Sequence, residues 1–217
     1  MMQLKSAGFS PILLKIPGLT APLQNAWTLE DYVNWFGAEI EKDTKINEPV
    51  IILGHSNGGR IAIAYAKANQ AKVGGLILVD SAGIYDRDWK ANTKRAVWGA
   101  VARLGRSLKK NKTLRNIFYK IVGEQDYRDA SPLMQETMRN MISADLAPIL
   151  PYIACPVAII WGERDTATPL RDGKLMKELL PNSTLTVIKE ARHSPQFTHV
   201  GEVVEAVKKY YNEKTNL

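Results

Sequence analysis

Residues 48–66 read EPVIILGHSNGGRIAIAYA, and this stretch carries the strongest structural signal in the chain. Residues 50–53 are apolar and mostly β-branched, which is typical of a strand buried on both faces of a parallel sheet. The composition of residues 60–66 favours a helix. The Gly-x-Ser-x-Gly motif between them leaves no room for an ordinary loop. The pattern therefore predicts a tight strand-to-helix turn with Ser56 at its corner.

So tight a turn needs small residues on its flanks. We expect that a Cβ at Gly54 or Gly58 would collide with the crossing backbone. Ser56 is then held in a strained conformation, with its hydroxyl aimed out of the sheet above a helix N-terminus. A glycine-rich turn with an incidental serine is the alternative interpretation. The flanking strand and helix favour a nucleophile.

Length and composition indicate one soluble globular domain with room for an insertion, since 217 residues can bury a proper core. The single cysteine, Cys155, excludes an internal disulfide and gives no sign of an oxidising compartment. The first 19 residues contain only short apolar runs broken by Pro11, Lys15 and Pro17, so they match neither a signal peptide nor a membrane span. We predict a cytoplasmic protein.

Strand-like and helix-like segments alternate along most of the chain, which predicts an α/β fold with a mostly parallel sheet flanked by helices. Helices are expected from Thr28 to Ile40, where Thr-Leu-Glu-Asp forms a capping sequence, after Ser56, at 170–180 and at 202–211. Strands are expected at 11–16, 50–53, 73–79, 157–161 and 185–188.

Residues 84–154 interrupt this alternation. They contain no convincing strand, and their apolar residues recur at helical spacing, as at Met134, Met138 and Met141. We therefore predict a core made of residues 1–83 and 155–217, with a helical cap or lid inserted at 84–154.

The net charge of +7 is concentrated in the predicted cap. Ten basic residues and no acidic residue lie between Trp89 and Lys120, so the rest of the chain carries −3. A solvated outer face is one interpretation. Attraction of an anionic substrate and adsorption to an anionic membrane surface are two others. Nucleic-acid binding is not expected, because no motif for reading bases accompanies the charge.

A serine nucleophile needs a base to take its proton and an acid to orient that base. His193 follows the predicted strand at 185–188, where a loop would place its imidazole at the carboxyl edge of the sheet. Asp165 and Asp80 also follow strands; Asp165 is the preferred acid and Asp80 the alternative. The chain order Ser, Asp, His, each directly after a strand, supports this set.

We expect the other two histidines to have structural roles. His55 adjoins Ser56 but points the other way along the strand, so we expect it to pack or hydrogen-bond locally. His199 lies in the approach to the last helix and is expected to be structural. We expect no metal and no cofactor.

Several pieces of the chain carry a resemblance to a known family: IPGL at 16–19, GHSNGG at 54–59, LVDSAG at 78–83, WGERD at 161–165 with Thr168-Pro169, and His193. They run from about residue 9 to the C-terminus and together resemble the α/β-hydrolase superfamily, in its esterase, lipase and carbon–carbon-bond hydrolase branch. The resemblance implies Ser56 as nucleophile, Asp165 as acid, His193 as base and a helical cap. A serine at the turn disfavours the dehalogenase and epoxide hydrolase branches, which use aspartate there.

The chain departs from the family pattern at its start. In the family, a central strand ending in a His-Gly type loop precedes the Pro-Gly-Leu stretch and supplies half of the oxyanion hole. Nothing ahead of Ser10 could form that strand, its loop and the following helix, and residues 1–8 resemble the tail of that helix. The expected fold thus lacks its first strands, and the N–H of Asn57 remains as one oxyanion donor. Low stability, aggregation or dimerisation through an exposed edge is expected.

Three functions remain open at this point. The first is hydrolysis of a carboxylic ester of modest size through an acyl-enzyme. The second is cleavage of a carbon–carbon bond in a diketone within the same fold. The third is a catalytically impaired protein that acts as a binding module, for which the missing strand is the main argument.

Overall fold

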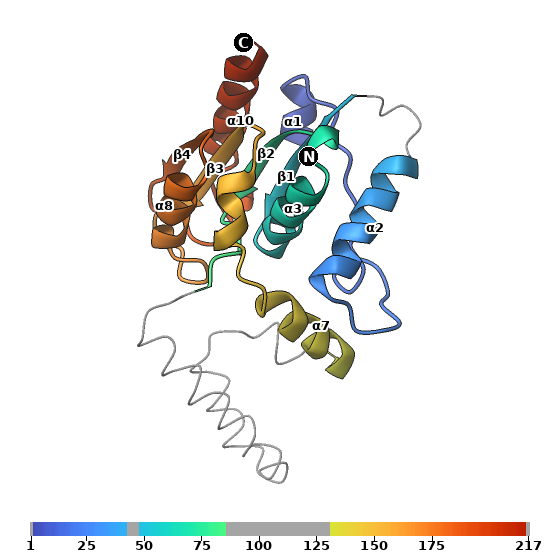
Figure 1. Cartoon of the computed structure of the whole chain (residues 1–217). Coiled ribbons are helices and arrows are strands. Elements are labelled where there is room, and N and C mark those ends of the chain that lie inside the picture. The colour runs from blue at the N-terminus through green and yellow to red at the C-terminus, as the bar shows by residue number, and fades with distance from the viewer. Residues whose placement is uncertain (1, 43–47, 86–130, 216–217) are drawn as a thin grey trace.

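The computed structural model describes residues 2–42, 48–85 and 131–215 of the 217-residue chain. Its centre is a parallel sheet of four strands in the order β1-β2-β3-β4 (Figure 1). The predicted α/β fold with a parallel sheet is confirmed. The strands are β1 (Val50–His55), β2 (Val73–Val79), β3 (Val157–Gly162) and β4 (Ser183–Ile188).

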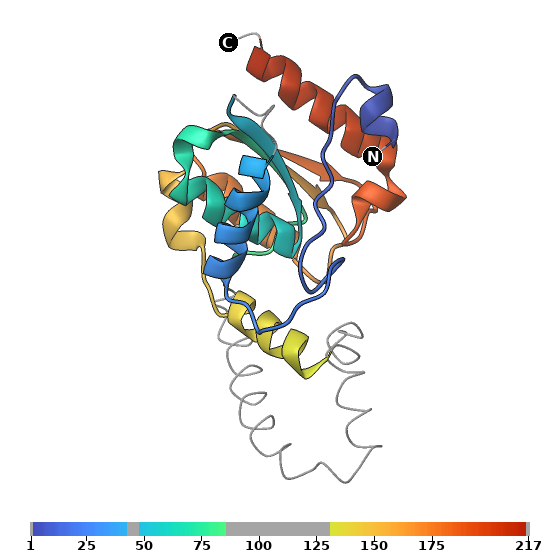
Figure 2. The ribbon, with the colours of Figure 1, turned by 90° about the vertical axis from the view of Figure 1, so that its right-hand side faces the viewer.

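Helices cover both faces of this sheet (Figures 1 and 2). On one face, α3 and α8 pack against the strands, and α2 packs on the outside of α3. On the other face, α10 packs against β3 and β4, and α1 contacts α10. The helical elements are α1 (Met2–Ser6), α2 (Leu29–Lys42), α3 (Asn57–Ala68), η1 (Gln70–Lys72), α7 (Pro132–Ile142), η2 (Ala147–Tyr152), α8 (Leu170–Leu179), α9 (Pro195–Thr198) and α10 (Val200–Thr215). No helix among these described residues is long and apolar enough to cross a bilayer.

The core follows from the period-two alternation of strand side chains. In β2, Leu76 and Leu78 belong to the apolar cluster under α3 and α8, whereas Ile77 and Val79 belong to the cluster under α10. Both sets are almost fully buried, which explains why β2 reads as an unbroken apolar run. Leu150, in η2, also lies in the first cluster, so the part of the chain just before β3 packs with the sheet.

The predicted start of the first long helix is confirmed. The backbone N–H of Thr28 donates to Asp31 Oδ2 at 2.7 Å, and the N–H of Asp31 donates to the Thr28 hydroxyl at 3.2 Å. This reciprocal pair is a capping box, with an acid closing it three residues into the helix. The helix it begins, α2, packs Val33, Phe36 and Ile40 against the core.

The predicted strand at 11–16 is wrong. Among residues 2–42, 48–85 and 131–215 this segment has no ladder partner, and the side chains of Ile12 and Leu13 are mostly exposed. A strand needs a neighbouring strand to bond, and Pro11 has no N–H to donate. Within the described residues, β1 is hydrogen-bonded to β2 alone and forms one edge of the sheet.

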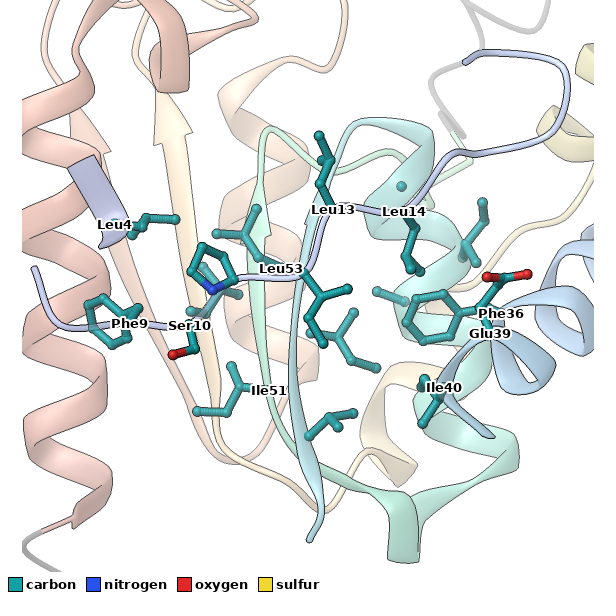
Figure 3. Close-up of a pocket in the computed structure, with 18 of the residues that line it drawn as sticks. Leu4, Phe9, Ser10, Leu13, Leu14, Phe36, Glu39, Ile40, Ile51 and Leu53 are labelled. Carbon is teal, nitrogen blue, oxygen red and sulfur yellow. The ribbon is translucent and has the colours of Figure 1, made fainter. Parts of the chain in front are cut away.

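A groove of about 580 Å³ lies between residues 9–16 and this free edge of β1 (Figure 3). Figure 3 shows the N-terminal segment passing across β1, with Ile51 and Leu53 among the side chains beneath it. The lining is mostly apolar and comes from both sides of the sheet. It includes Phe36 and Ile61 from α2 and α3, and Val207 from α10. In the part of the chain that the structure describes, the edge of β1 is therefore flanked by apolar surface and not by a further strand.

Residues 86–130, which hold most of the predicted cap and its whole basic segment at 89–120, lie outside the described residues. The predicted helix around Met134 to Met141 is confirmed as α7, whose N-terminus is capped by the Ser131 hydroxyl. Helix α7 is held to the chain before α2 by two hydrogen bonds. The N–H of Trp27 donates to Thr137 Oγ1 at 3.0 Å, and the Asn140 amide donates to the Trp27 carbonyl at 3.2 Å.

Candidate active site

Ser56 occupies the sharp corner between β1 and α3 with φ 51° and ψ −121°, as the sequence predicts. A non-glycine residue at positive φ is strained and persists only where its surroundings hold it. Here the Ser56 N–H donates to the Val79 carbonyl at 3.2 Å, and the Ser56 carbonyl accepts the N–H of Ala82 at 2.9 Å. The corner is thus tied to the end of β2 and to the segment that follows it.

Two of the three glycines around this corner are required by close contacts. A Cβ at Gly54 would lie 2.6 Å from the Gly58 carbonyl oxygen, as expected. A Cβ at Gly58 would meet no atom within 4 Å, so the expected collision there is wrong. The tight contact instead falls at Gly59, where a Cβ would lie 2.1 Å from Ser81 Oγ. The difference arises because α3 turns Gly59, not Gly58, toward the end of β2.

The carboxyl ends of all four strands meet at one edge of the sheet. Ser56 follows β1, Asp80 follows β2, and Asp165 lies three residues beyond the end of β3. His193 lies five residues beyond the end of β4. Because parallel strands all end at the same edge, residues more than 130 positions apart come together there.

Ser56, His193 and Asp165 lie in hydrogen-bond contact. His193 Nε2 lies 3.1 Å from Ser56 Oγ, and His193 Nδ1 lies 2.8 Å from Asp165 Oδ2. A carboxylate only accepts, so Nδ1 carries the proton of the neutral ring and Nε2 is left to accept the serine hydroxyl. This is the tautomer that a general base facing Ser56 requires.

The electrostatics of the pair follow from these contacts. The hydrogen bond to Asp165 raises the pKa of His193 above its ordinary value, against the opposing effect of burial. Burial by itself would raise the pKa of Asp165, but hydrogen bonds from His193, Thr168 and Ala167 outweigh it and lower that pKa. Asp165 is therefore ionised at neutral pH and stabilises the protonated form of His193.

Thr168 also contacts Asp165 and His193, although the sequence does not predict a role for it in the site. Its hydroxyl lies 2.7 Å from Asp165 Oδ2 and 3.3 Å from His193 Nδ1. The backbone N–H groups of Ala167 and Thr168 donate to the other oxygen, Asp165 Oδ1. The Asp-x-x-Thr spacing was the available signal, since a side chain three residues ahead can close a turn on an aspartate.

Asp80, the alternative acid, faces a different partner. It is fully buried, and its Oδ1 accepts the N–H of Gly162 at 2.7 Å, which ties the end of β2 to the end of β3. Its Oδ2 is buried without a partner in the described part of the chain. Burial raises the pKa of Asp80 to about 7, with the nearby Asp165 charge adding to the rise.

The remaining candidates lie as follows. Asn57, the candidate oxyanion donor, is the first residue of α3, and its N–H meets no acceptor in the described ranges. His55 contacts the loop that follows β4, with Nε2 2.6 Å from the His193 carbonyl oxygen. His199 contacts its neighbour Thr198, at 2.9 Å between Oγ1 and Nδ1, and stays apart from the cluster.

Residues 28–197 match the family model for serine aminopeptidase, S33, which covers more than half of the chain. The chain belongs to this α/β-hydrolase family.

Curated relatives of this α/β-hydrolase are enzymes of several activities. It is 27% identical over 174 residues to a pimeloyl-[acyl-carrier protein] methyl ester esterase of Chromobacterium violaceum, covering 73% of this chain and 68% of that protein. It is 25% identical to Lipase 3 of a Moraxella species, covering 74% and 53%. A 2-hydroxy-6-oxononadienedioate/2-hydroxy-6-oxononatrienedioate hydrolase of Dechloromonas aromatica is 23% identical, covering 90% and 74%. The matched part thus spans about half of the lipase and two thirds of the esterase.

Solved structures support the fold of this α/β-hydrolase. An alpha/beta hydrolase from the metagenome of lagoon sediments at Mar Chica, Morocco, superimposes with a TM-score of 0.63 at 23% identity, covering 87% of this chain and 71% of that one. A thermophilic esterase from Thermogutta terrifontis gives a TM-score of 0.63 at 20% identity, covering 91% and 76%.

One cluster in the described residues has the composition of a metal site. His55, Asp80 and His193 each offer a ligand atom, and these atoms lie within 4.8 Å of one another. Both histidines already hydrogen-bond inside the site, His55 to the His193 carbonyl and His193 to Asp165 and Ser56. A metal bound there would have to replace those contacts.

Proposed function

We propose that the protein hydrolyses a carboxylic ester of modest size through an acyl-enzyme formed on Ser56. The observation that carries the proposal is the row of contacts from Asp165 through His193 to Ser56, 2.8 Å and 3.1 Å long. Both distances are hydrogen-bond distances, which proton transfer between these groups requires. The esterase and lipase relatives support the same reaction class.

The proposed reaction has two halves. Ser56 Oγ attacks the ester carbonyl carbon while its proton passes to His193 Nε2, and Asp165 stabilises the imidazolium that forms. The tetrahedral intermediate carries its negative charge beside the N–H of Asn57. Its collapse breaks the carbon–oxygen bond, and the alcohol leaves with the proton from His193. Water, deprotonated by His193, then attacks the acyl-enzyme and releases the acid and free Ser56.

The N–H of Asn57, at the start of α3, is the oxyanion donor that we propose. Loss of one such donor costs roughly 10²–10³-fold in turnover in another serine hydrolase. This N–H would therefore contribute to the rate at which the acyl-enzyme forms.

The test is covalent labelling combined with Ser56→Ala. A fluorophosphonate probe should label the wild-type protein at Ser56, because only a serine activated by a base reacts with it. Ser56→Ala should lose labelling and hydrolysis of p-nitrophenyl esters while it keeps the wild-type circular dichroism spectrum. Wild-type turnover by Ser56→Ala would refute the assignment of the nucleophile. A wild-type protein that is never labelled would favour the alternative of an inactive binding module.

Cleavage of a carbon–carbon bond in a diketone is the second candidate. It is favoured by the relative from Dechloromonas aromatica that is named as a 2-hydroxy-6-oxononadienedioate/2-hydroxy-6-oxononatrienedioate hydrolase, whose match covers 90% of this chain. The same three side chains would serve it. A ring-cleavage dione tested against a panel of p-nitrophenyl esters separates the two, since the ratio of their kcat/KM values states the preference directly.

The proposed partners follow from the same reasoning. The substrate is a small ester or acyl compound. The basic residues between 89 and 120 would attract an anionic substrate or an anionic membrane surface, and the free edge of β1 would allow self-association. A helical cap at 84–154 and a cytoplasmic location remain predictions from the sequence.

A further inference from the structure

His55 joins the nucleophile corner to the loop that carries the base. It is the last residue of β1, directly before Ser56. Its Nε2 lies 2.6 Å from the backbone carbonyl oxygen of His193, which is 138 residues away along the chain. The two imidazole rings also pack together, with centroids 4.9 Å apart at an interplanar angle of 46°.

The chemistry of this contact defines the state of His55. A carbonyl oxygen can only accept, so His55 Nε2 must carry the hydrogen. Burial lowers the pKa of His55 and outweighs the opposing effect of its hydrogen bond to the His193 carbonyl. The ring is therefore neutral at pH 7, with its proton on Nε2. It acts as a fixed neutral donor and cannot itself replace His193 as the base for Ser56.

The loop that carries His193 has few other restraints near that residue. Upstream, the Ala191 carbonyl accepts the N–H of Arg164 at 2.8 Å, and downstream the Ser194 carbonyl accepts the N–H of Phe197 at 3.0 Å. Between these points, the bond from His55 is the one hydrogen bond to the His193 main chain within the described ranges. The side chain of His193 is oriented by Asp165, but its backbone is located by His55.

We infer that His55 is a positioning residue for the reaction, which holds the His193 main chain so that Nε2 stays 3.1 Å from Ser56 Oγ. Because His55 and Ser56 are consecutive, one short stretch supplies both the nucleophile and the anchor of its base. A displacement of Ser56 would then displace His193 in the same direction. This inference rests on the proposed function, since it assigns a part in the same proton transfer.

The experiment separates the hydrogen bond from the ring contact. His55→Phe keeps an aromatic ring against His193 but has no donor. His55→Gln loses the ring, but its amide N–H reaches about as far as Nε2. His199→Phe makes the same replacement at a histidine whose ring nitrogen Nδ1 lies 2.9 Å from its neighbour Thr198 and which is not part of the Ser56–His193–Asp165 cluster, so it is the matched control. His55→Leu replaces His55→Phe if the larger ring prevents folding, and thermal unfolding is measured for each variant.

We expect His55→Phe to lower kcat for a p-nitrophenyl ester about 10–100-fold with KM changed less than about twofold, since a displacement of ~1 Å can cost ~10²-fold. The rate of fluorophosphonate labelling should fall by a similar factor. His55→Gln should recover most of both losses, and His199→Phe should match the wild type. A second readout is the His193 Nδ1–H proton in the NMR spectrum, which should broaden or disappear in His55→Phe and return in His55→Gln.

Two results would overturn the inference. One is a folded His55→Phe protein with wild-type kcat, labelling rate and Nδ1–H resonance. The other is His55→Gln as impaired as His55→Phe at the same melting temperature, because the donor would then not be what matters. If even the wild type is never labelled, the proposed function fails, and the Nδ1–H resonance across the same variants still decides whether His55 positions His193.

Discussion

Burial and hydrogen bonding shift the pKa values of His193, Asp165 and Asp80 in different directions. The pKa of His193 is raised chiefly by its hydrogen bond to Asp165, and that of Asp165 is lowered because its hydrogen bonds outweigh its burial. Asp80, only one strand away, has its pKa raised to about 7 by burial. The two acids therefore differ in charge near neutral pH, and Asp165 is the one that stays ionised.

Asp165→Asn should cripple turnover, by roughly 10⁴-fold in analogy with other triads, since an amide at this place favours the tautomer of His193 with its hydrogen on Nε2. His193 must be neutral to act as a base. The wild-type kcat/KM should therefore fall as pH drops through a value above the ordinary histidine pKa, and residual activity in Asp165→Asn should fall at a lower pH. Rate profiles from pH 5 to 9 measure both. Asp80→Asn should stay within about tenfold of wild type, and the reverse ranking would assign the acid to Asp80.

Asp80→Asn should also change how stability depends on pH. The folded-state pKa of about 7 is above the unfolded value, so the folded protein binds the extra proton. The contribution of Asp80 to the free energy of unfolding is therefore lost as pH rises from the unfolded-state pKa to about 7. Asparagine keeps the acceptor for the Gly162 N–H and cannot ionise. We expect Asp80→Asn to gain about 1–3 kcal/mol over wild type between pH 5 and pH 8.

Urea unfolding at pH 5, 6.5 and 8 tests this expectation. The control is Glu178→Gln, which removes an exposed carboxylate on α8. Parallel stability curves for Asp80→Asn and wild type would show that Asp80 does not carry a buried, raised-pKa carboxyl.

At the scale of elements, β1 is both the strand that carries the nucleophile and an edge of the described sheet. Leu53 is 43% exposed beside the apolar groove, although β1 has the composition of a strand buried on both faces. Unpaired backbone groups next to apolar side chains are a template for pairing with another strand. We therefore expect, as a proposal, that the strand that positions Ser56 also favours self-association through this edge.

Leu53→Lys should reduce concentration-dependent self-association, because a charge on an edge strand opposes pairing. Sedimentation velocity over a wide concentration range measures the change. Val187→Lys is the matched control, since Val187 is 42% exposed on β4, the strand at the opposite edge. A wild-type protein that stays monomeric and melts cooperatively well above ordinary mesophile temperatures would contradict the prediction, as would equal effects of the two lysines.

At the scale of the whole molecule, charge is distributed unevenly along the chain. The net charge is +7, yet the ten cations between Trp89 and Lys120 exceed that total. The remaining residues are mildly acidic. A long-range field of this kind raises encounter rates with anions and is screened by salt.

If these cations steer the substrate, kcat/KM for an anionic ester should fall several-fold between about 20 and 300 mM salt, where the Debye length shrinks from roughly 20 Å to 6 Å. A neutral ester of equal size should change little. Equal responses of the two esters would exclude steering. Co-sedimentation with vesicles, with and without anionic lipid, then distinguishes membrane adsorption from a solvated face.

The sequence by itself determined the features that depend on neighbours along the chain. Apolar runs and helical periodicity predict β1 to β4, α2, α3, α8 and α10 to within a few residues. The Gly-x-Ser-x-Gly motif predicts the corner at Ser56, because only a tight turn fits between that strand and that helix. The order of Ser56, Asp165 and His193 after their strands brings all three to one edge, since parallel strands end together.

Only the tertiary structure decided the features that depend on distant partners. Residues 11–16 have strand composition, but they form no hydrogen-bonded ladder with any strand in the described part of the chain, and a strand requires such a partner. Asp80 and Asp165 both follow strands, and only the path of the loop after β4 brings His193 against Asp165. The bond from His55 to the His193 carbonyl spans 138 residues. Local sequence encodes the tendency of each segment, whereas packing alone decides which segments meet.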